Sequence, residues 1–129
     1  MITNLHSVAV FVSDRDRALR FYRDALGFEV TADVTDPNSA ENRWLTLKPR
    51  SGQTNIMLLK APPQNQSSEA NQSSHIVLTS DDLETDCELI AKNGGRMLYP
   101  PKRAGWGNAM ETHIADPDGN IYQLVQMGQ

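Results

Sequence analysis

The feature that most constrains this chain of 129 residues is an internal repeat, because one pattern of secondary-structure signals occurs twice. Each copy starts with an apolar, β-branched strand, continues with an amphipathic helix that ends at glycine, and closes with three further strands. On this pattern His6 corresponds to His75, and Met57 corresponds to Gln123. A chain with such a repeat is expected to fold as two similar modules that share one core.

The boundaries of the two copies define the predicted domain organisation. Module one covers residues 1–60, module two covers 74–129, and a stretch over 61–73 that is rich in Pro, Gln, Asn and Ser predicts a linker. A small module cannot cover both faces of its own sheet. We therefore predict an α+β fold in which two tandem βαβββ modules form a curved, barrel-like mixed sheet around a cavity, with the helices outside.

Local signals place the ends of the two helices and one tight turn. Ser13 with Asp16 predicts the start of the first helix, and Asp81 with Glu84 predicts the start of the second. The run Asp-Pro-Asp-Gly-Asn over 116–120 predicts a hairpin turn, since proline presets φ while glycine and asparagine tolerate positive φ.

Composition excludes several classes of partner. Twelve basic residues against sixteen acidic ones give a net charge of −4, which disfavours nucleic acid because its binding needs a basic surface. No apolar run approaches the roughly 20 residues that span a membrane, so no membrane partner is expected. The single cysteine, Cys87, excludes an internal disulfide framework, and a cytoplasmic location is the expectation.

Three segments carry a likeness to a known family, namely VAVFVSDRDRALRFYRDALGFEV at 8–30, HIVLTSDDLETDCELIAKNGG at 75–95 and ADPDGNIYQLVQ at 115–126. Together with the repeat, they resemble the vicinal oxygen chelate superfamily, which includes glyoxalase I, extradiol dioxygenases and bleomycin resistance proteins. The resemblance covers nearly the whole chain. It is specific for the fold and less so for the reaction, because this fold hosts several chemistries.

The resemblance implies a metal site built from the first and last strands of each module. Carried onto this chain, the glyoxalase-type ligand positions are His6, Met57, His75 and Gln123, and the dioxygenase type keeps His6, His75 and Gln123. Two imidazoles suit one divalent ion such as Zn, Ni, Fe or Mn. The amide of Gln123 and the thioether of Met57 are poor substitutes for the carboxylates of that family, so we expect weak metal binding or a protein without metal.

Strand alternation predicts which side chains line the cavity. Residues two apart share a face, so His6 is grouped with Val8 and Val10, Met57 with Leu59, and His75 with Val77. Aromatic residues near the cavity are added as ligand walls. The predicted pocket residues are Val8, Val10, Trp44, Met57, Leu59, Val77 and Trp106.

Glu111 and His113 alternate on one face of the predicted strand over 108–115. If that face turns inward, Glu111 supplies a carboxylate or a general base and the pair is catalytic. The simpler alternative, which the sequence favours, is an exposed polar face of the strand.

Three functions remain open from the sequence. The favoured one is a small-molecule enzyme of the glyoxalase or dioxygenase type, a lyase, isomerase or dioxygenase in which a metal chelates adjacent oxygens of the substrate. The alternative is a metal-free protein of the bleomycin resistance type that binds and sequesters an antibiotic-like ligand. A regulatory domain that senses a metabolite is the weakest option. The resemblance also implies a homodimer.

Overall fold

The computed structural model describes residues 1–61, 73–105 and 107–128. Along the chain the elements are β1 (Ser7–Val12), α1 (Arg15–Asp24), β2 (Phe28–Asp36), β3 (Ser39–Pro49), β4 (Asn55–Lys60), β5 (Ser73–Thr79), α3 (Leu83–Lys92), β6 (Arg96–Met97), β7 (Lys102–Arg103), β8 (Ala109–Ala115) and β9 (Ile121–Met127). The predicted linker over 61–73 lies outside the described residues except at its two ends. None of the described helices is long and apolar enough to cross a membrane.

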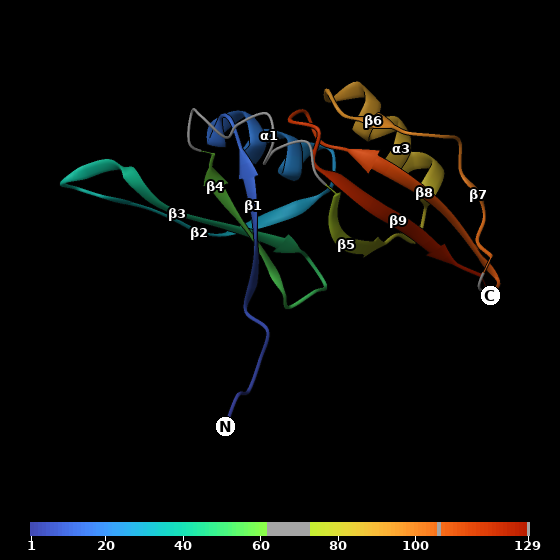
Figure 1. Cartoon of the computed structure of the whole chain (residues 1–129), viewed down its shortest axis with the longest axis horizontal. Helices are drawn as coiled ribbons and strands as arrows, with labels where there is room; N and C mark the ends of the chain where they lie inside the picture. The colour runs from blue at the N-terminus through green and yellow to red at the C-terminus, as the bar shows by residue number, and fades with distance from the viewer. Residues whose placement is uncertain (62–72, 106, 129) are drawn as a thin grey trace.

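The strands form two sheets, one from each half of the chain. The first has the order β1-β4-β3-β2, and the second has the order β5-β9-β8-β6 with the short β7 also paired to β8. The predicted tandem βαβββ modules are therefore confirmed (Figure 1). The described strands do not join into one closed barrel, since β1 and β5 are each an edge of a separate sheet.

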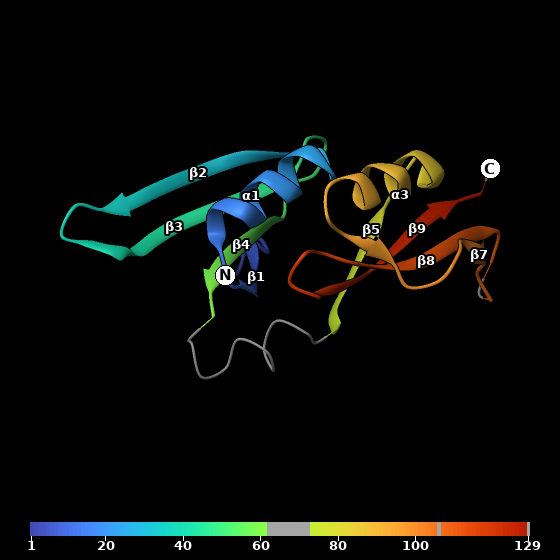
Figure 2. The same cartoon turned by 90° about the horizontal axis from the view of Figure 1, so that it is seen from above.

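Both helices pack against the sheets through the stripes that the sequence predicts. In α1 the buried residues include Phe21 and Tyr22, and in α3 they include Cys87 and Ile90. These side chains belong to one apolar core that also contains residues of both sheets. Both helices lie along the top of the molecule in Figure 1, and Figure 2 shows them from above. Each helix packs on one face of its sheet, so each sheet has a second face that its own helix does not cover.

The helix starts differ from the prediction by one residue each. Asp14, not Ser13, caps α1 by accepting hydrogen bonds from the backbone of Asp16 and Arg17. Asp82, not Asp81, caps α3 and accepts from the backbone of Thr85. An aspartate is as good a cap as a serine, and short polar side chains occupy adjacent positions at both starts, so the spacing alone did not distinguish them.

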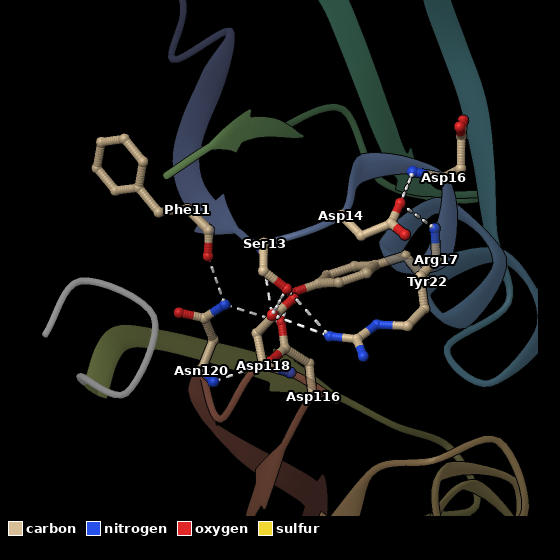
Figure 3. Close-up of polar contacts among 9 residues, drawn as sticks. All are labelled: Phe11, Ser13, Asp14, Asp16, Arg17, Tyr22, Asp116, Asp118 and Asn120. Atoms are coloured by element: carbon tan, nitrogen blue, oxygen red, sulfur yellow. Dashed lines mark hydrogen bonds and ion pairs between the residues drawn. The ribbon is translucent and has the colours of Figure 1, made fainter. Parts of the chain in front are cut away.

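The predicted turn over 116–120 is present and joins the two modules (Figure 3). Gly119 adopts a φ of 88° there. Asn120 donates from Nδ2 to the carbonyl of Phe11 at 2.8 Å, and Asp118 accepts from Ser13 Oγ at 2.5 Å. Ser13 therefore does not cap α1, because its hydroxyl binds Asp118 of the other module.

Next to this turn, the contact between the two modules, which we call the junction, is buried and polar. Tyr22 of α1 donates to Asp116 Oδ2 at 2.8 Å, and its hydroxyl lies 2.6 Å from that of Tyr122 on β9. Burial raises the pKa of Asp116 and of both tyrosines above their ordinary values. The junction holds the two sheets in one arrangement through bonds between residues about a hundred positions apart.

The free face of the first sheet is largely apolar. Ile56 and Leu58 of β4 point into the core, so the alternating Met57 and Leu59 point away from α1. Register places Met57 beside Ala9 of β1. We call the apolar part of this surface the apolar face; its side chains are Ala9, Phe11, Trp44, Met57 and Leu59. By the same alternation the buried polar residues Thr46 and Asn55 also lie on this side of the sheet.

Candidate functional site

A group of polar side chains lies on the second sheet, on the side away from α3. On β8 the core side is marked by Ile114, which is fully buried in the shared core. His113 and Glu111 alternate with it and therefore occupy the opposite side. Register on β9 places Gln123 directly beside His113. The sheet thus brings three polar side chains from two strands to one place.

The segment before β8 completes this group. Tyr99 is held because its backbone carbonyl accepts a hydrogen bond from Thr112 Oγ1 at 2.6 Å. Its hydroxyl lies 2.9 Å from Glu111 Oε2 and 2.5 Å from His113 Nδ1. Gln123 donates from Nε2 to the same Glu111 oxygen at 3.3 Å. One phenol therefore connects the carboxylate with the imidazole.

Lys102 of β7 supplies the positive charge of the group. Its Nζ lies 3.9 Å from Glu111 Oε1 and 4.8 Å from the centre of the Tyr99 ring. Burial and the hydrogen bond to Glu111 raise the pKa of Tyr99 to about 12, so the phenol keeps its proton at neutral pH. We call this group the polar cluster; it consists of Tyr99, Lys102, Glu111, His113 and Gln123.

The burial of Glu111 decides between the two interpretations of this strand. Its exposed fraction is 7%, and His113 is half-buried. The favoured expectation of an exposed polar face is therefore wrong, because the segment that carries Tyr99 and Lys102 runs beside β8 and the Tyr99 hydroxyl contacts Glu111. What the polar cluster does to a ligand is a separate question.

From the sequence, Tyr99 is only one of several aromatic residues that could line a pocket, and Lys102 has no predicted role. Tyr99 and Lys102 flank Pro100 and Pro101, and this segment forms two very short strands instead of one alternating strand. Proline interrupts the pairing of a strand, so no face could be assigned to either side chain. The register of β7 on β8, in which Lys102 pairs with Glu111, is the information that the sequence lacks.

The candidate metal positions in module one lie at the base of the apolar face. His6 precedes β1, is exposed, and its ring lies 6.3 Å from that of Trp44. Met57 is half-buried on β4. His6 therefore does not continue the alternation of β1, in which Val10 belongs to the core on the other side of the sheet.

The candidate metal positions in module two lie near the polar cluster. His75 is exposed and has a φ of 57°, at a point where the pairing of β5 with β9 shifts in register. Val77, two residues later, is the register partner of Gln123. Gln123 uses its amide nitrogen on Glu111, which leaves its amide oxygen as the atom that can face a ligand.

The predicted pocket residues do not share one cavity. Val8 and Val77 line a cleft of about 610 Å³ between the modules, and Leu59 lines another cavity of about 550 Å³ with Phe11. Trp44 is 47% exposed. Met57 shares the apolar face with Leu59, Val10 is buried in the core, and Trp106 lies outside the described residues.

The donor chemistry at the four candidate positions fits a divalent metal poorly. The four donors are two imidazoles, a thioether and a neutral amide. None of them carries a negative charge that would offset a dication. Glu111 is a carboxylate that contacts this set through Gln123, and it already accepts from Tyr99 and Gln123. Among the described residues, no group of three or more His, Cys, Asp or Glu side chains is arranged to hold a metal.

Comparison with known proteins agrees with the fold and the repeat. A solved structure of a member of the Glyoxalase/bleomycin resistance protein/dioxygenase superfamily from Sphaerobacter thermophilus DSM 20745 is 31% identical to this chain. Its TM-score is 0.79, over 97% of this chain and 98% of that one. TnmS3, an antibiotic binding protein from Streptomyces sp. CB03234, is 28% identical, with a TM-score of 0.75 over 98% of both chains. A probable lactoylglutathione lyase from Synechocystis sp. (strain ATCC 27184 / PCC 6803 / Kazusa) is 26% identical over 95% of this chain and 93% of its own length.

The family assignment rests on the sequence as a whole. The model of the Glyoxalase/Bleomycin resistance protein/Dioxygenase superfamily matches residues 4–124, which span both modules. This chain belongs to the Glyoxalase/Bleomycin resistance protein/Dioxygenase superfamily.

Proposed function

We propose that this protein is a small-molecule enzyme that works by proton transfer at the polar cluster. The observation that carries the proposal is the buried carboxylate of Glu111 bonded through Tyr99 to the imidazole of His113. Carboxylate, phenol and imidazole side chains are the kinds of group that enzymes use in acid–base catalysis, and here the three form one hydrogen-bonded chain. The similarity to a probable lactoylglutathione lyase supports an enzyme of the lyase type.

The substrate class follows from the other side chains of the polar cluster. Gln123 offers an amide oxygen and Lys102 an ammonium, which suit a ligand rich in oxygen and hydrogen-bond donors. Metal-assisted chelation of adjacent oxygens, with His6, His75 and Gln123 as ligands, stays a prediction of the family resemblance. The donors at those positions fit a metal poorly, and the proton transfer at the polar cluster requires none.

We further propose that the protein acts as a cytoplasmic homodimer. Trp44 and Val34 of the first sheet are 47% and 62% exposed, and they face each other across β2 and β3. Exposed apolar side chains grouped in this way are typical of an interface. A second copy would cover the apolar face and close the space over the ligand. Sedimentation should give twice the mass of one chain, and a monomer at every concentration contradicts this part.

The experiment that tests the function uses ligands chosen by chemistry. The wild-type protein is incubated with S-lactoylglutathione and with a panel of small hydroxy- and keto-carbonyl compounds, and each mixture is followed by proton NMR. We expect chemical conversion of at least one compound, and loss of that conversion in His113→Asn. His6→Asn is the matched control, since His6 is exposed and lies outside the polar cluster. Conversion that survives His113→Asn contradicts the proposal.

A second function is favoured by a different surface. The apolar face suits a planar or apolar ligand. TnmS3, which is similar to this chain over 98% of both chains, is an antibiotic binding protein. On this alternative the protein sequesters an antibiotic-like compound and returns it unchanged. The two functions separate in one titration with planar aromatic and cationic compounds. Tight binding without conversion that is weakened by Trp44→Ala, and not by His113→Asn, favours sequestration.

A further inference from the structure

We infer that the Tyr99 phenol fixes His113 as the tautomer with its proton on Nδ1, and that Nε2 is thereby the atom that accepts a proton from the ligand. This inference deepens the proposed function and rests on it for its chemical meaning. The tautomer itself is a property of the protein alone. It can therefore be measured before any ligand is known.

The first step concerns the single hydrogen of the phenol. The Tyr99 oxygen lies 2.9 Å from Glu111 Oε2 and 2.5 Å from His113 Nδ1, so it has two partners and one proton to donate. An ionised carboxylate can only accept a hydrogen bond. If the phenol donated to His113, its oxygen and the carboxylate oxygen would face each other with lone pairs alone. The phenol therefore donates to Glu111.

The second step follows for the imidazole. With its hydrogen directed at Glu111, the phenol oxygen can only accept from His113 Nδ1, which must then carry the ring proton. Burial keeps the phenol protonated, because the pKa of Tyr99 is raised to about 12. A neutral imidazole has one N–H, so its other nitrogen is an acceptor. Free histidine prefers the opposite tautomer, and this arrangement therefore requires the phenol.

The third step concerns Nε2, the other ring nitrogen of His113. His113 Nε2 has no hydrogen-bond partner among the residues that the structure describes, and the ring is half-buried on the face away from α3. Gln123 lies beside it in register on β9. A ligand on this face thus meets an amide group and a nitrogen lone pair. The ligand class is a molecule with an acidic C–H next to a carbonyl, or with an O–H or N–H.

The chemical step is a proton transfer that balances without a co-reactant. The proton moves from the ligand to Nε2, and the electron pair of the broken bond stays on the ligand. The imidazolium that forms donates from Nδ1 to the Tyr99 oxygen, and the Glu111 carboxylate behind the phenol offsets the new charge. Glu111 and Tyr99 are positioning residues in this arrangement, since His113 alone meets the ligand. A buried carboxylate that orients an imidazole is a recurrent device in enzymes, here with a phenol between the two.

The test reads the tautomer by two-bond ¹H–¹⁵N correlation NMR of the full chain. The chain has three histidines, so the spectrum is simple to assign with His6→Asn and His75→Asn. At about pH 9 an imidazole of ordinary pKa is neutral. We expect His113 to be mainly the Nδ1–H tautomer, and His6 to show the mixture of a free imidazole. A His113 that carries its proton mainly on Nε2 overturns the inference without any mutation.

Two variants identify the cause. Tyr99→Phe removes only the hydroxyl, and we expect His113 to shift to the Nε2–H tautomer. Lys102→Met is the matched control, because it removes a charge near Glu111 and leaves the phenol–imidazole contact in place. We expect the tautomer of Lys102→Met to match the wild type. An unchanged tautomer in Tyr99→Phe, or an equal shift in both variants, overturns the role of the phenol. Amide spectra that match the wild type show that each variant is folded.

The result separates this inference from the proposed function. If the tautomer is as expected but no compound is converted, the arrangement of the polar cluster holds and the enzymatic function fails. If a compound is converted through His113 while the tautomer is Nε2–H, the function holds and the relay through Tyr99 fails.

Discussion

The free faces of the two sheets differ far more than the sheets themselves. Apart from the additional short strand β7 in the second, the modules have the same order of elements, and both send alternate residues into one shared core. On the side away from the helices, the first sheet presents Phe11, Met57 and Leu59, whereas the second presents Glu111, His113 and Gln123. Since a residue on the free face does not affect packing under the helix, the two copies of the module were able to diverge there.

The comparison teaches where each kind of chemistry is located. The polar cluster needs fixed donors and acceptors, and the segment from Tyr99 to Lys102 supplies them by folding over β8. The first module has a continuous long hairpin of β2 and β3 in the corresponding place. One half of the repeat is therefore arranged for hydrogen bonding and the other for apolar contact.

The largest expected effects come from the side on which the modules are alike. Leu45 and Ile114 are both fully buried on the core side of their sheets. We expect Leu45→Ala and Ile114→Ala each to lower the free energy of unfolding by about 2–5 kcal/mol, because each leaves a cavity in a close-packed core. Urea unfolding followed by circular dichroism measures both. A loss below about 1 kcal/mol in either variant would show that its sheet is not part of a shared core.

The free faces should then respond differently to a conservative change. Tyr99→Phe deprives the buried Glu111 of a donor, and we expect a loss of about 1–3 kcal/mol. Met57→Leu on the apolar face keeps volume and polarity, so its loss should stay below about 1.5 kcal/mol. The same urea unfolding experiment compares them. Equal losses would remove the distinction between a fixed polar cluster and an adaptable apolar face.

The sequence predicts most of the fold because apolar residues recur at the periods of helices and strands. Phe21 and Tyr22 recur at helical spacing with Ala18, and all three are buried in α1. The sequence does not show whether the two sheets join, because a contact of edge strands between modules leaves no local pattern; the described strands form two separate sheets. The structure instead joins the modules through the turn over 116–120.

The candidate site was predictable only where alternation holds. Glu111 and His113 lie on one regular strand, and their shared face could be inferred before the structure. His6 precedes its strand and His75 lies at a register shift, so alternation did not determine where either side chain points. Tyr99 is brought to Glu111 by a segment with two prolines, for which no periodicity exists.

Acid should act in opposite directions on the first sheet and on the junction with the second. Arg43 hydrogen-bonds Asp33 on β2 and lowers its pKa below the ordinary 3.8, whereas burial raises the pKa of Asp116 above it. The stability that Asp33 contributes is present above pH 3.8 and is lost as pH falls through its lowered pKa. Ionised Asp116 disfavours the folded state, and protonation relieves this as pH falls through its raised pKa.

A carboxyl NMR titration measures the two groups separately. We expect the midpoint of Asp33 below 3.8 and that of Asp116 above 3.8. In Asp33→Asn, the deficit in unfolding free energy relative to the wild type should be largest near neutral pH and should shrink as pH falls. Midpoints in the reverse order would show that the junction is hydrated and that Asp116 is not buried between the modules.

A metal would break the division between the two faces, because its candidate ligands come from both. His6 belongs to the first module, and His75 and Gln123 belong to the second. The smallest effect we expect is that of His75→Ala on metal content.

Protein purified without chelator and without a histidine tag is incubated in turn with Zn, Ni, Fe and Mn, desalted and measured by plasma mass spectrometry. Because no carboxylate stands among the candidate ligands, we expect well under one ion per chain and no difference in the variant. One tightly held ion per wild-type chain, absent from His75→Ala, would show that the two faces build one site, and proton transfer at the polar cluster would then have to be reconsidered as one part of a metal-dependent reaction.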